Sequence, residues 1–394
     1  MLYLPYVPWV REYAFIRAVF TIRAADTLKR FYSRCIYRTC RGYKCFGADP
    51  ELLPAILNQR KAFAMKNILL ISTGGTIASK PTAQGLAPAL SPDELLAHLP
   101  GIGGICKVET LGLFDLDSTN MTPALWVELA GVIEKKYADY DGFVITHGTD
   151  TMAYAAAALS YLIRTSPKPI VLTGSQISIY ADDTDAVGNL TSAFLYAASE
   201  YACGVHIVFD GKVILGTRAR KMRTKSFNAF SSIDYPDVAH IRGGRVINFI
   251  DERRECAAPK FYHDLCPEVL SIRLIPGMSP SVFDFAAGHA RAVIIESFGV
   301  GGIPYYDSTD FADAVGRLIK ADVRVIITTQ VPHEGSDMDV YKVGHAVKAK
   351  YKLIEAYDMT TEALILKTMW SLAESRDDES FRACFEAPVA HDML

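Results

Sequence analysis

The feature that most constrains the fold is an alternation of short apolar runs with helical patterns, which begins after Met65. Each apolar run has five or six residues and is rich in Val, Ile and Leu, as is typical of parallel strands buried on both faces. The alternation predicts an α/β fold with a mainly parallel sheet flanked by helices. The strands that we expect span residues 68–72, 142–146, 169–173, 205–209, 292–296 and 323–328.

The segments between these runs carry helix-start signals. Residues 91–94 read Ser-Pro-Asp-Glu, which is the pattern of a capping box with Pro in the first turn. Residues 122–123 read Thr-Pro and begin a second helix, which we expect to continue to Tyr137. Two further helices are expected at 153–162 and 189–198.

A polar stretch at residues 250–268 divides the pattern into two parts. A chain of 394 residues is long enough for two domains. We therefore expect a larger N-terminal domain at 65–255 and a smaller C-terminal α/β domain at 269–394. The strands of the second domain are expected near 269–274, 292–297 and 323–328.

Residues 1–64 differ from the rest of the chain in charge, with eleven Lys and Arg against four Asp and Glu. A basic leader of this kind is compatible with a transit peptide or a nucleic-acid-binding arm. Charges interrupt each apolar run, so neither a secretory signal nor a membrane span is predicted. Because Met65 stands just before the first expected strand, we interpret residues 1–64 as an N-terminal extension outside the functional fold, such as an over-extended translation start.

Composition and residue spacing argue against several classes of function. The net charge of −3 gives no polyanion-binding signal, so we expect no nucleic-acid partner. The eight cysteines form no CxxC pair and the nine histidines show no metal-ligand spacing. We therefore expect no metal site and no disulfide framework. This cysteine usage fits a reducing compartment.

The sequence Thr-Gly-Gly-Thr follows the first expected strand, at residues 73–76. It matches neither the dinucleotide-binding pattern nor the P-loop pattern, so a phosphate cradle is not indicated. A structural turn and a catalytic turn remain as alternatives. Ligand sites in parallel sheets lie beyond the carboxyl ends of the strands, which is where Gly75 and Thr76 would be.

A second polar turn, His147-Gly148-Thr149-Asp150-Thr151, follows the strand expected at 142–146. Helix capping is the ordinary interpretation, because Thr and Asp are favoured at N-caps. Two hydroxyls and a carboxylate at one strand end could instead hold a small polar substrate.

Two further segments allow both a plain and a functional interpretation. Asp117, Ser118 and Thr119 precede the second helix, either as an ordinary loop or as hydroxyls that bind a carboxylate. Five basic residues between 218 and 225 form either a solvated loop or a site in which one lysine turns inward. A Thr hydroxyl is a weak nucleophile that needs a neighbouring base, which Asp150 and Lys221 could supply.

Taken together, these motifs resemble the L-asparaginase (asparaginase/glutaminase) family in its bacterial cytoplasmic type I form. The resemblance covers residues 65–394, and the later segments 296–304 and 328–344 continue it in the same order. The motifs that carry it are TGGTIAS (73–79), DSTNMTP (117–123), DGFVITHGTDTMAY (141–154), PIVLTGSQ (169–176) and GTRARKMRTKSFNAF (216–230).

The resemblance implies hydrolysis of L-asparagine to L-aspartate and ammonia through an acyl-threonine intermediate, without a cofactor. Thr76 would be the nucleophile, and Thr149, Asp150 and Lys221 would form a second catalytic group. The family forms homodimers or dimers of dimers, in which the neighbouring subunit completes each site. The substrate-binding positions implied are Asp117, Ser118, Thr119, Gly75, Gly148 and Glu334.

The sequence departs from the family pattern in a few places. Family members often carry a lid tyrosine that polarises the first threonine, whereas residues 84–86 read Gln-Gly-Leu. Asn120 replaces an Asp, Gly302 stands where an Asn is frequent, and Val331 stands where type I proteins often have Cys. The first departure concerns the activation of Thr76, and the others concern substrate fit and regulation.

Two alternatives to a free-standing asparaginase follow from the same residues. The family includes the ammonia-supplying subunit of a tRNA-dependent amidotransferase, which has an extra N-terminal domain. Residues 1–64 lack the alternating strand pattern that such a folded domain would show. A sensor that binds asparagine without turnover is the non-enzymatic alternative, and the presence of Asp150 and Lys221 beside both threonines argues against it.

Overall fold

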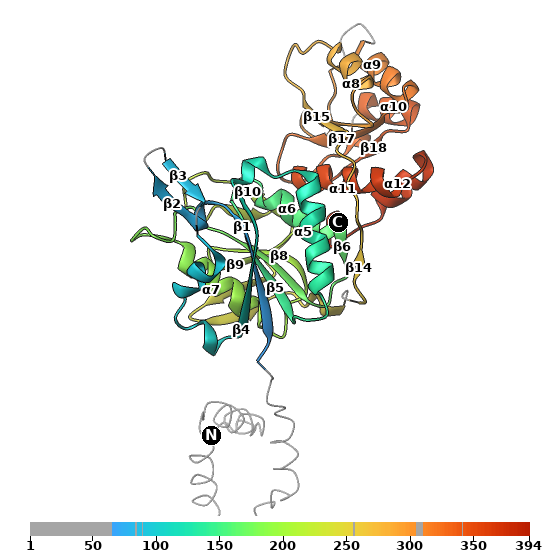
Figure 1. The fold of residues 1–394 in the computed structure, drawn as a ribbon. Helices are drawn as coiled ribbons and strands as arrows, with labels where there is room; N and C mark the ends of the chain where they lie inside the picture. The colour runs from blue at the N-terminus through green and yellow to red at the C-terminus, as the bar shows by residue number, and fades with distance from the viewer. Residues whose placement is uncertain (1–64, 83–84, 89, 255–256, 305–309, 341) are drawn as a thin grey trace, which may run out of the picture. The chain divides into compact units, whose positions relative to one another are not determined.

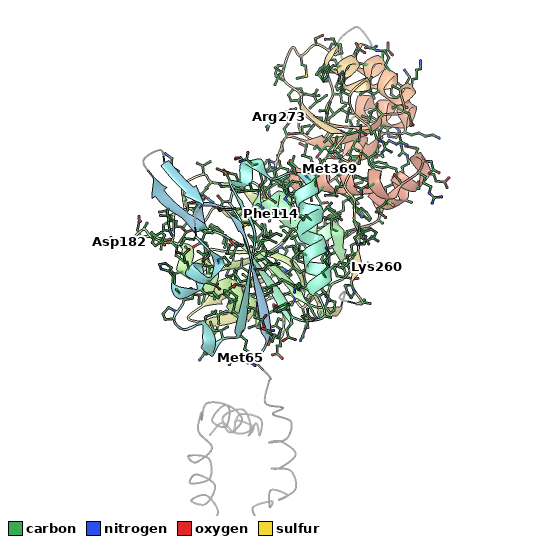
Figure 2. The ribbon with its side chains drawn as sticks, in the orientation of Figure 1. Met65, Phe114, Asp182, Lys260, Arg273 and Met369 are labelled. Atoms are coloured by element: carbon green, nitrogen blue, oxygen red, sulfur yellow. The ribbon has the colours of Figure 1, made fainter. Side chains whose placement is uncertain are left out.

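The computed structural model describes residues 65–394 except 83–84, 89, 255–256, 305–309 and 341. The expectations for residues 1–64 and for Gln84 therefore lie outside the described residues. Met65, labelled in Figure 2, is exposed and lies two residues before the first strand. Within these ranges, each helix is too short or too polar to cross a lipid bilayer.

The large N-terminal α/β domain is built on an eight-stranded sheet (Figure 1). Its strand order is β13-β12-β9-β8-β7-β5-β1-β4, and the strands from β8 to β4 run parallel. β9, β12 and β13 continue the sheet in antiparallel orientation. The predicted α/β fold with a mainly parallel sheet is confirmed. The strands are β1 (Asn67–Gly74), β4 (Lys107–Leu116), β5 (Gly142–Thr146), β7 (Pro169–Thr173), β8 (Gly204–Phe209), β9 (Lys212–Leu215), β12 (Ala239–Arg242) and β13 (Arg245–Asn248).

The apolar-run pattern reveals the central strands and misses the edges of the sheet. β5 and β7 have the predicted bounds, and β1 and β8 extend the predicted strands by a few residues. β4 lies at one edge, and its side chains are half-buried or exposed, so it lacks a continuous apolar run. The short antiparallel strands at the other edge give an equally weak signal.

Helices cover both faces of this sheet because successive side chains of a strand point in opposite directions. Leu69 and Ile71 of β1 belong to the core that includes α5 and α6. Ile68 and Leu70 belong to the opposite core, which includes α4 and α7. The alanine-rich α6 is buried along almost its whole length. These helices are α4 (Pro92–Ala97), α5 (Pro123–Lys136), α6 (Met152–Leu162) and α7 (Ala186–Ala197), and α4 has the predicted capping box.

The smaller C-terminal α/β domain has a four-stranded parallel sheet in the order β15-β16-β17-β18. Its own core joins the sheet to α8 and α9, and α11 packs on α6 of the larger domain. Its strands are β15 (Val269–Arg273), β16 (Ala292–Ser297), β17 (Arg324–Thr329) and β18 (Ile354–Glu355). Its helices are α8 (Val282–Ala287), α9 (Asp310–Lys320), α10 (Lys342–Tyr351), α11 (Thr361–Glu374) and α12 (Asp378–Glu386).

Short elements complete the fold. Three two-stranded sheets pair β2 with β3, β6 with β14 and β10 with β11. These strands are β2 (Ser79–Thr82), β3 (Gly85–Pro88), β6 (Ile163–Arg164), β14 (Lys260–Phe261), β10 (Ala219–Lys221) and β11 (Phe230–Ser232). The single-turn 3-10 helices are η1 (Thr76–Ala78), η2 (Ile102–Gly104), η3 (Ser118–Asn120), η4 (Glu252–Arg254) and η5 (Met338–Val340).

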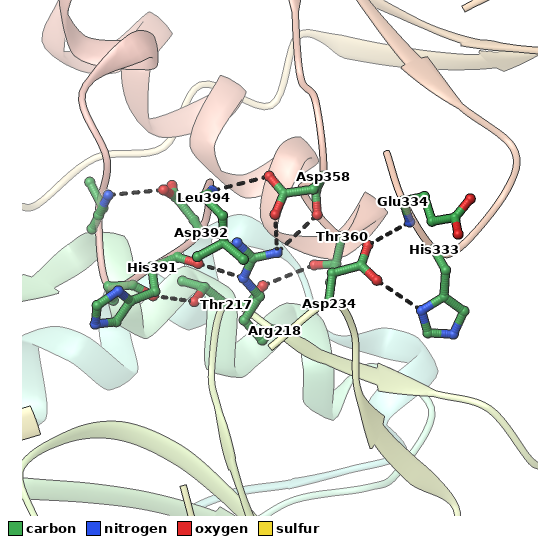
Figure 3. A network of polar contacts seen from close by, with 12 residues as sticks. Thr217, Arg218, Asp234, His333, Glu334, Asp358, Thr360, His391, Asp392 and Leu394 are labelled. Carbon is green, nitrogen blue, oxygen red and sulfur yellow. Dashed lines mark hydrogen bonds and ion pairs between the residues drawn. The ribbon is translucent and has the colours of Figure 1, made fainter. Parts of the chain in front are cut away.

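A buried polar network joins the segment before β10 to the C-terminal part of the chain (Figure 3). The Arg218 guanidinium is fully buried and forms an ion pair of 3.0 Å with Asp358, and it also donates to the carbonyl of His391. Thr217 donates to the Ala390 carbonyl at 2.6 Å. These contacts fix the chain immediately before β10, which carries one of the predicted catalytic residues.

Candidate active site

Apart from Lys221 and Glu334, the predicted site residues follow neighbouring strands at the same edge of the large sheet. Asp117 comes directly after β4, Gly75 after β1 and His147 after β5, and Gln176 lies three residues beyond β7. Because β4, β1, β5 and β7 are parallel neighbours, their carboxyl ends meet. This edge is where open parallel sheets place their ligands.

Two glycines bring the turns after β1 and β5 into backbone contact. A Cβ atom at Gly75 would lie 2.5 Å from the Gly148 nitrogen, and Gly75 also has a φ of +85°. A Cβ atom at Gly148 would lie 2.6 Å from Ser118 Oγ. Side chains cannot approach this closely, so only glycine fits at either position. The contact holds the segments that carry Thr76, Thr149 and Ser118 together.

The geometry unites Thr149, Asp150 and Lys221. Lys221 Nζ lies 2.8 Å from Thr149 Oγ1 and 2.6 Å from Asp150 Oδ1. The Lys221 side chain is 14% exposed and that of Asp150 is 58% exposed, so the group opens to solvent on its carboxylate side. Lys221 is placed by β10, where it pairs with Phe230 of β11. A lysine in this position can supply or receive the proton of the threonine hydroxyl.

Two contacts in these segments go beyond helix capping and a solvated basic loop. The N-cap of α6 is Thr151, and no side-chain hydrogen bond caps this helix. Thr151 instead donates its hydroxyl to the Ser118 carbonyl at 2.7 Å. In the basic segment, Arg223 and Lys225 are exposed, whereas Lys221 turns toward the strand ends.

The segment after β4 forms a small pre-ordered loop. Asp117 is the N-cap of η3, and its Oδ1 accepts from the amide of Thr119 at 2.9 Å and from its hydroxyl at 3.0 Å. Ser118 is buried against Gly148. The loop therefore presents two hydroxyls next to the turn that carries Thr149.

Thr76 is half-buried at the start of η1, and no described residue hydrogen-bonds its hydroxyl. The amide of Gly75 donates to the Leu116 carbonyl at 3.0 Å. In contrast, no acceptor for the amide of Thr149 is found among the described residues. The Gly75 amide is therefore occupied, whereas the Thr149 amide is free to bind a ligand.

Glu334 belongs to a different polar network. Its amide donates to Asp234 Oδ2 at 2.9 Å, and its φ of +73° marks a sharp turn (Figure 3). The neighbouring His333 binds the other oxygen of Asp234 at 3.0 Å. Within the described residues, Glu334 forms no hydrogen bond or ion pair with Thr149, Asp150 or Lys221.

Two further residues contact the turn that carries Thr149. Gln176 accepts from Thr149 Oγ1 at 3.3 Å and donates to the Ser226 carbonyl at 3.1 Å. The sequence analysis did not select Gln176, although its place just beyond a buried strand is the same signal that identified the other turns. His147 is buried and forms a 2.8 Å hydrogen bond between Nδ1 and the Gly148 carbonyl. Burial lowers the pKa of His147 to about 4.

The described part of the chain holds no group of three or more His, Cys, Asp or Glu side chains arranged to bind a metal. The cluster at the strand ends contains hydroxyls, the carboxylates of Asp117 and Asp150, the ammonium of Lys221 and backbone amides. This set of groups is suited to acyl transfer by a threonine nucleophile.

Two family models match the chain: "Asparaginase, N-terminal" at residues 67–253 and "Glutaminase/Asparaginase C-terminal domain" at residues 268–385. The L-asparaginase of Thermococcus kodakarensis is 40% identical over 329 residues, which is 83% of this chain and 98% of that protein. Its solved structure superposes with a TM-score of 0.77 at 38% identity, and the match covers 83% of this chain and 99% of that one.

Of two other relatives, one is named as an asparaginase and one as an amidotransferase subunit. L-asparaginase I from Vibrio cholerae superposes with a TM-score of 0.73 at 28% identity over 84% of this chain and all of that chain. One of the subunits of the glutamyl-tRNA(Gln) amidotransferase from Thermofilum pendens is 30% identical over 83% of this chain and 75% of that protein. With both halves matched in order, the chain belongs to the asparaginase/glutaminase family.

Proposed function

We propose that this protein is an amidohydrolase that converts L-asparagine and water to L-aspartate and ammonia. The observation that carries the proposal is the contact of Lys221 Nζ with both Thr149 Oγ1 and Asp150 Oδ1, beside the turn that bears Thr76. The 40% identity to an L-asparaginase over almost the whole of that protein supports asparagine as the substrate.

The proposed reaction has two steps. The Thr76 hydroxyl attacks the side-chain amide carbon, ammonia leaves, and a β-acyl-threonine remains. Water then hydrolyses this ester, with Thr149, Lys221 and Asp150 moving the proton. The tetrahedral oxyanion of each step is bound by the backbone amides of Thr149 and Thr76, because the Gly75 amide already donates to Leu116. Each such donor contributes about 3 kcal/mol to transition-state stabilisation.

The remaining residues are proposed to bind the substrate. Ser118 and Thr119 hydrogen-bond the α-carboxylate, with Asp117 holding Thr119 in place. The exposed oxygen of Asp150 takes the α-amino group. The glycines Gly75 and Gly148 allow close approach of the substrate, and Glu334 is proposed to act in the site of a neighbouring subunit.

We further infer the bacterial type I form of the family, acting in the cytoplasm as a homodimer or a dimer of dimers. The likeness to an L-asparaginase I supports the form. The described cysteines are free thiols, which a reducing compartment maintains: Cys106, Cys203, Cys266 and Cys384. The proposed domains are residues 65–255 and 269–394, with residues 1–64 as an extension outside them.

A second candidate function is an ammonia-supplying subunit of a tRNA-dependent amidotransferase. The 30% identity to one component of a glutamyl-tRNA(Gln) amidotransferase favours keeping this candidate. Amidase activity that requires tRNA and a second protein component would distinguish it from a free-standing enzyme.

The decisive experiment measures ammonia release from L-asparagine by residues 65–394 and by the full chain. Thr76→Ala and Thr149→Ala variants are measured beside them, with circular dichroism as a control for folding. Release by the wild type and its loss in both folded variants is the expected result. Full activity of Thr76→Ala would place the nucleophile elsewhere, and an inactive wild type would contradict a free-standing asparaginase.

A further inference from the structure

His147 is a buried histidine in the turn that carries Thr149, and the proposed reaction gives it no role. The residue is 1% exposed, and its Nδ1 lies 2.8 Å from the carbonyl oxygen of Gly148. A carbonyl oxygen can only accept a hydrogen bond, so Nδ1 must carry the proton. The ring therefore donates to the peptide group that links Gly148 to Thr149.

This peptide group is the one whose N–H belongs to Thr149. In a trans peptide the C=O and the N–H point in opposite directions from the same rigid plane. A donor that holds the Gly148 carbonyl therefore fixes the direction of the Thr149 amide. That amide has no acceptor among the described residues, as expected for a group reserved for a ligand.

We propose that His147 is a positioning residue, which anchors the Gly148–Thr149 peptide so that the Thr149 amide points at the oxyanion of the reaction. The inference rests on the proposed function, because it assigns the purpose of an amide in that mechanism. It extends that mechanism to a residue that touches neither substrate nor reacting atoms.

The other nitrogen of the ring supports a dedicated role. Nε2 is buried, and no described residue hydrogen-bonds it. A buried polar atom without a partner lowers the stability of the fold, so an apolar side chain would fill this space more favourably. The low pKa, about 4, means that the neutral ring carries its single proton on Nδ1 at physiological pH. The ring therefore leaves Nε2 without a partner while Nδ1 donates to the Gly148 carbonyl.

The surrounding backbone explains why one hydrogen bond is enough to set the orientation. The His147 amide donates to the Thr173 carbonyl at 2.9 Å. A Cβ atom at Gly174 would lie 2.3 Å from the His147 carbonyl oxygen, which shows how closely the segment after β7 packs on this turn. Residue 147 is thereby fixed on both sides, and the Gly148 carbonyl is the next group that needs a partner.

The test compares His147→Leu with His147→Asn. The Asn side-chain nitrogen takes nearly the place of Nδ1 and can donate to the same carbonyl, whereas Leu fills the space without a donor. Loss of an oxyanion donor costs about 10²–10³ in kcat, so misdirecting one should lower kcat about 10- to 100-fold in His147→Leu. KM should change little, because the oxyanion exists only in the transition state. His147→Asn should recover most of the lost kcat.

A second measurement does not depend on the substrate. Hydrogen exchange of the peptide that contains Thr149 should be faster in His147→Leu than in the wild type and near the wild-type rate in His147→Asn. Unchanged exchange and unchanged kcat in His147→Leu would overturn the inference, as would equal losses in both variants. An inactive wild type would contradict the proposed function, while the exchange comparison would still decide whether His147 anchors the peptide.

Discussion

The two turns that carry threonine differ in how completely the protein holds the hydroxyl. Thr149 is 7% exposed, and its Oγ1 contacts Lys221 at 2.8 Å and Gln176 at 3.3 Å. Thr76 is half-buried, and its hydroxyl has no hydrogen bond to a described residue. The two turns nevertheless touch, through the backbones of Gly75 and Gly148.

This difference teaches that a charged donor and an acceptor are arranged around only one of the two threonine hydroxyls in the described residues. In the turn after β5, the Thr149 hydroxyl accepts from the charged Lys221 and donates to Gln176. The turn after β1 fixes the backbone next to Thr76, through two glycines with positive φ and a close contact to the neighbouring turn. For the proposed reaction, this leaves the Thr76 hydroxyl without a proton acceptor among the described residues.

The largest expected effect comes from removing the ammonium group beside Thr149. Lys221→Met should lower kcat for asparagine by about 10²–10⁴, the usual contribution of a positioned acid or base. The free energy of unfolding should change by less than about 1 kcal/mol, because the partner carboxylate of Asp150 is largely exposed. Steady-state kinetics and urea denaturation measure the two quantities.

The control for this variant is Lys225→Met in the same basic segment, where the side chain is exposed. It should retain wild-type kcat and stability. If Lys221→Met and Lys225→Met had the same kcat, the reaction would not depend on the ammonium group beside Thr149. The contrast between the two turns would then have no consequence for activity.

The next effect concerns the acid stability of the turn after β5. The folded pKa of His147 is about 4, below the ordinary value of 6.5, because the ring is buried. Stability from the neutral ring is therefore fully present above pH 6.5 and is lost as the pH falls toward 4. The loss should reach about 3 kcal/mol over this window. No charged neighbour contributes to the shift.

Urea denaturation of wild type and His147→Leu from pH 7 to pH 4 measures this loss. Other groups titrate in both proteins, so the difference in the free energy of unfolding isolates His147. The wild type should lose stability relative to the variant as the pH falls. A constant difference across the window would contradict this prediction, because it would mean that folding does not lower the pKa of His147.

The third prediction breaks the contact between the two turns. Gly75→Ala should lower the free energy of unfolding by about 2 kcal/mol or more, because its Cβ atom would lie 2.5 Å from a backbone nitrogen and its φ is +85°. Activity should fall as well, since Thr76 would be displaced. Gly204→Ala is the matched control, because Gly204 has a φ of +65° with open space around it.

Gly204→Ala should cost only about 1 kcal/mol, the strain of positive φ alone, and should leave kcat unchanged. Thermal unfolding of the two variants separates the cost of positive φ, which both share, from the steric clash with Gly148, which only Gly75→Ala introduces. Equal destabilisation would show that the two turns can move apart at no cost, and that their contact does not position Thr76.

The sequence was sufficient for the central strands and for the residues at their ends, because buried parallel strands give continuous apolar runs. Through the family resemblance it implied Thr149, Asp150 and Lys221 as one group, and the structure brings them together. It could not reveal β4, whose side chains are partly exposed. It also could not reveal that His147 donates to Gly148, because a histidine beside a turn glycine looks the same whether or not its ring holds a peptide.

The smallest expected effect tests which of the two turns depends on the loop after β4, which contains Asp117, Ser118 and Thr119. Asp117→Ala removes the acceptor for the amide and hydroxyl of Thr119, at a cost of about 1 kcal/mol in stability, as for other lost N-caps. The same energy lost in substrate binding would raise KM for asparagine about fivefold. Asp117→Asn keeps an acceptor oxygen and should lie close to the wild type.

A rise in KM with unchanged kcat would mean that Asp117 only pre-orders a binding loop. A fall in kcat without a rise in KM would contradict that role. It would connect the loop to the turn after β5, through the contact of Ser118 with Gly148 and the hydrogen bond from Thr151 to the Ser118 carbonyl. In that case the turn that holds its threonine hydroxyl would also depend on the strand at the edge of the sheet, and its organisation would extend across β4, β1 and β5.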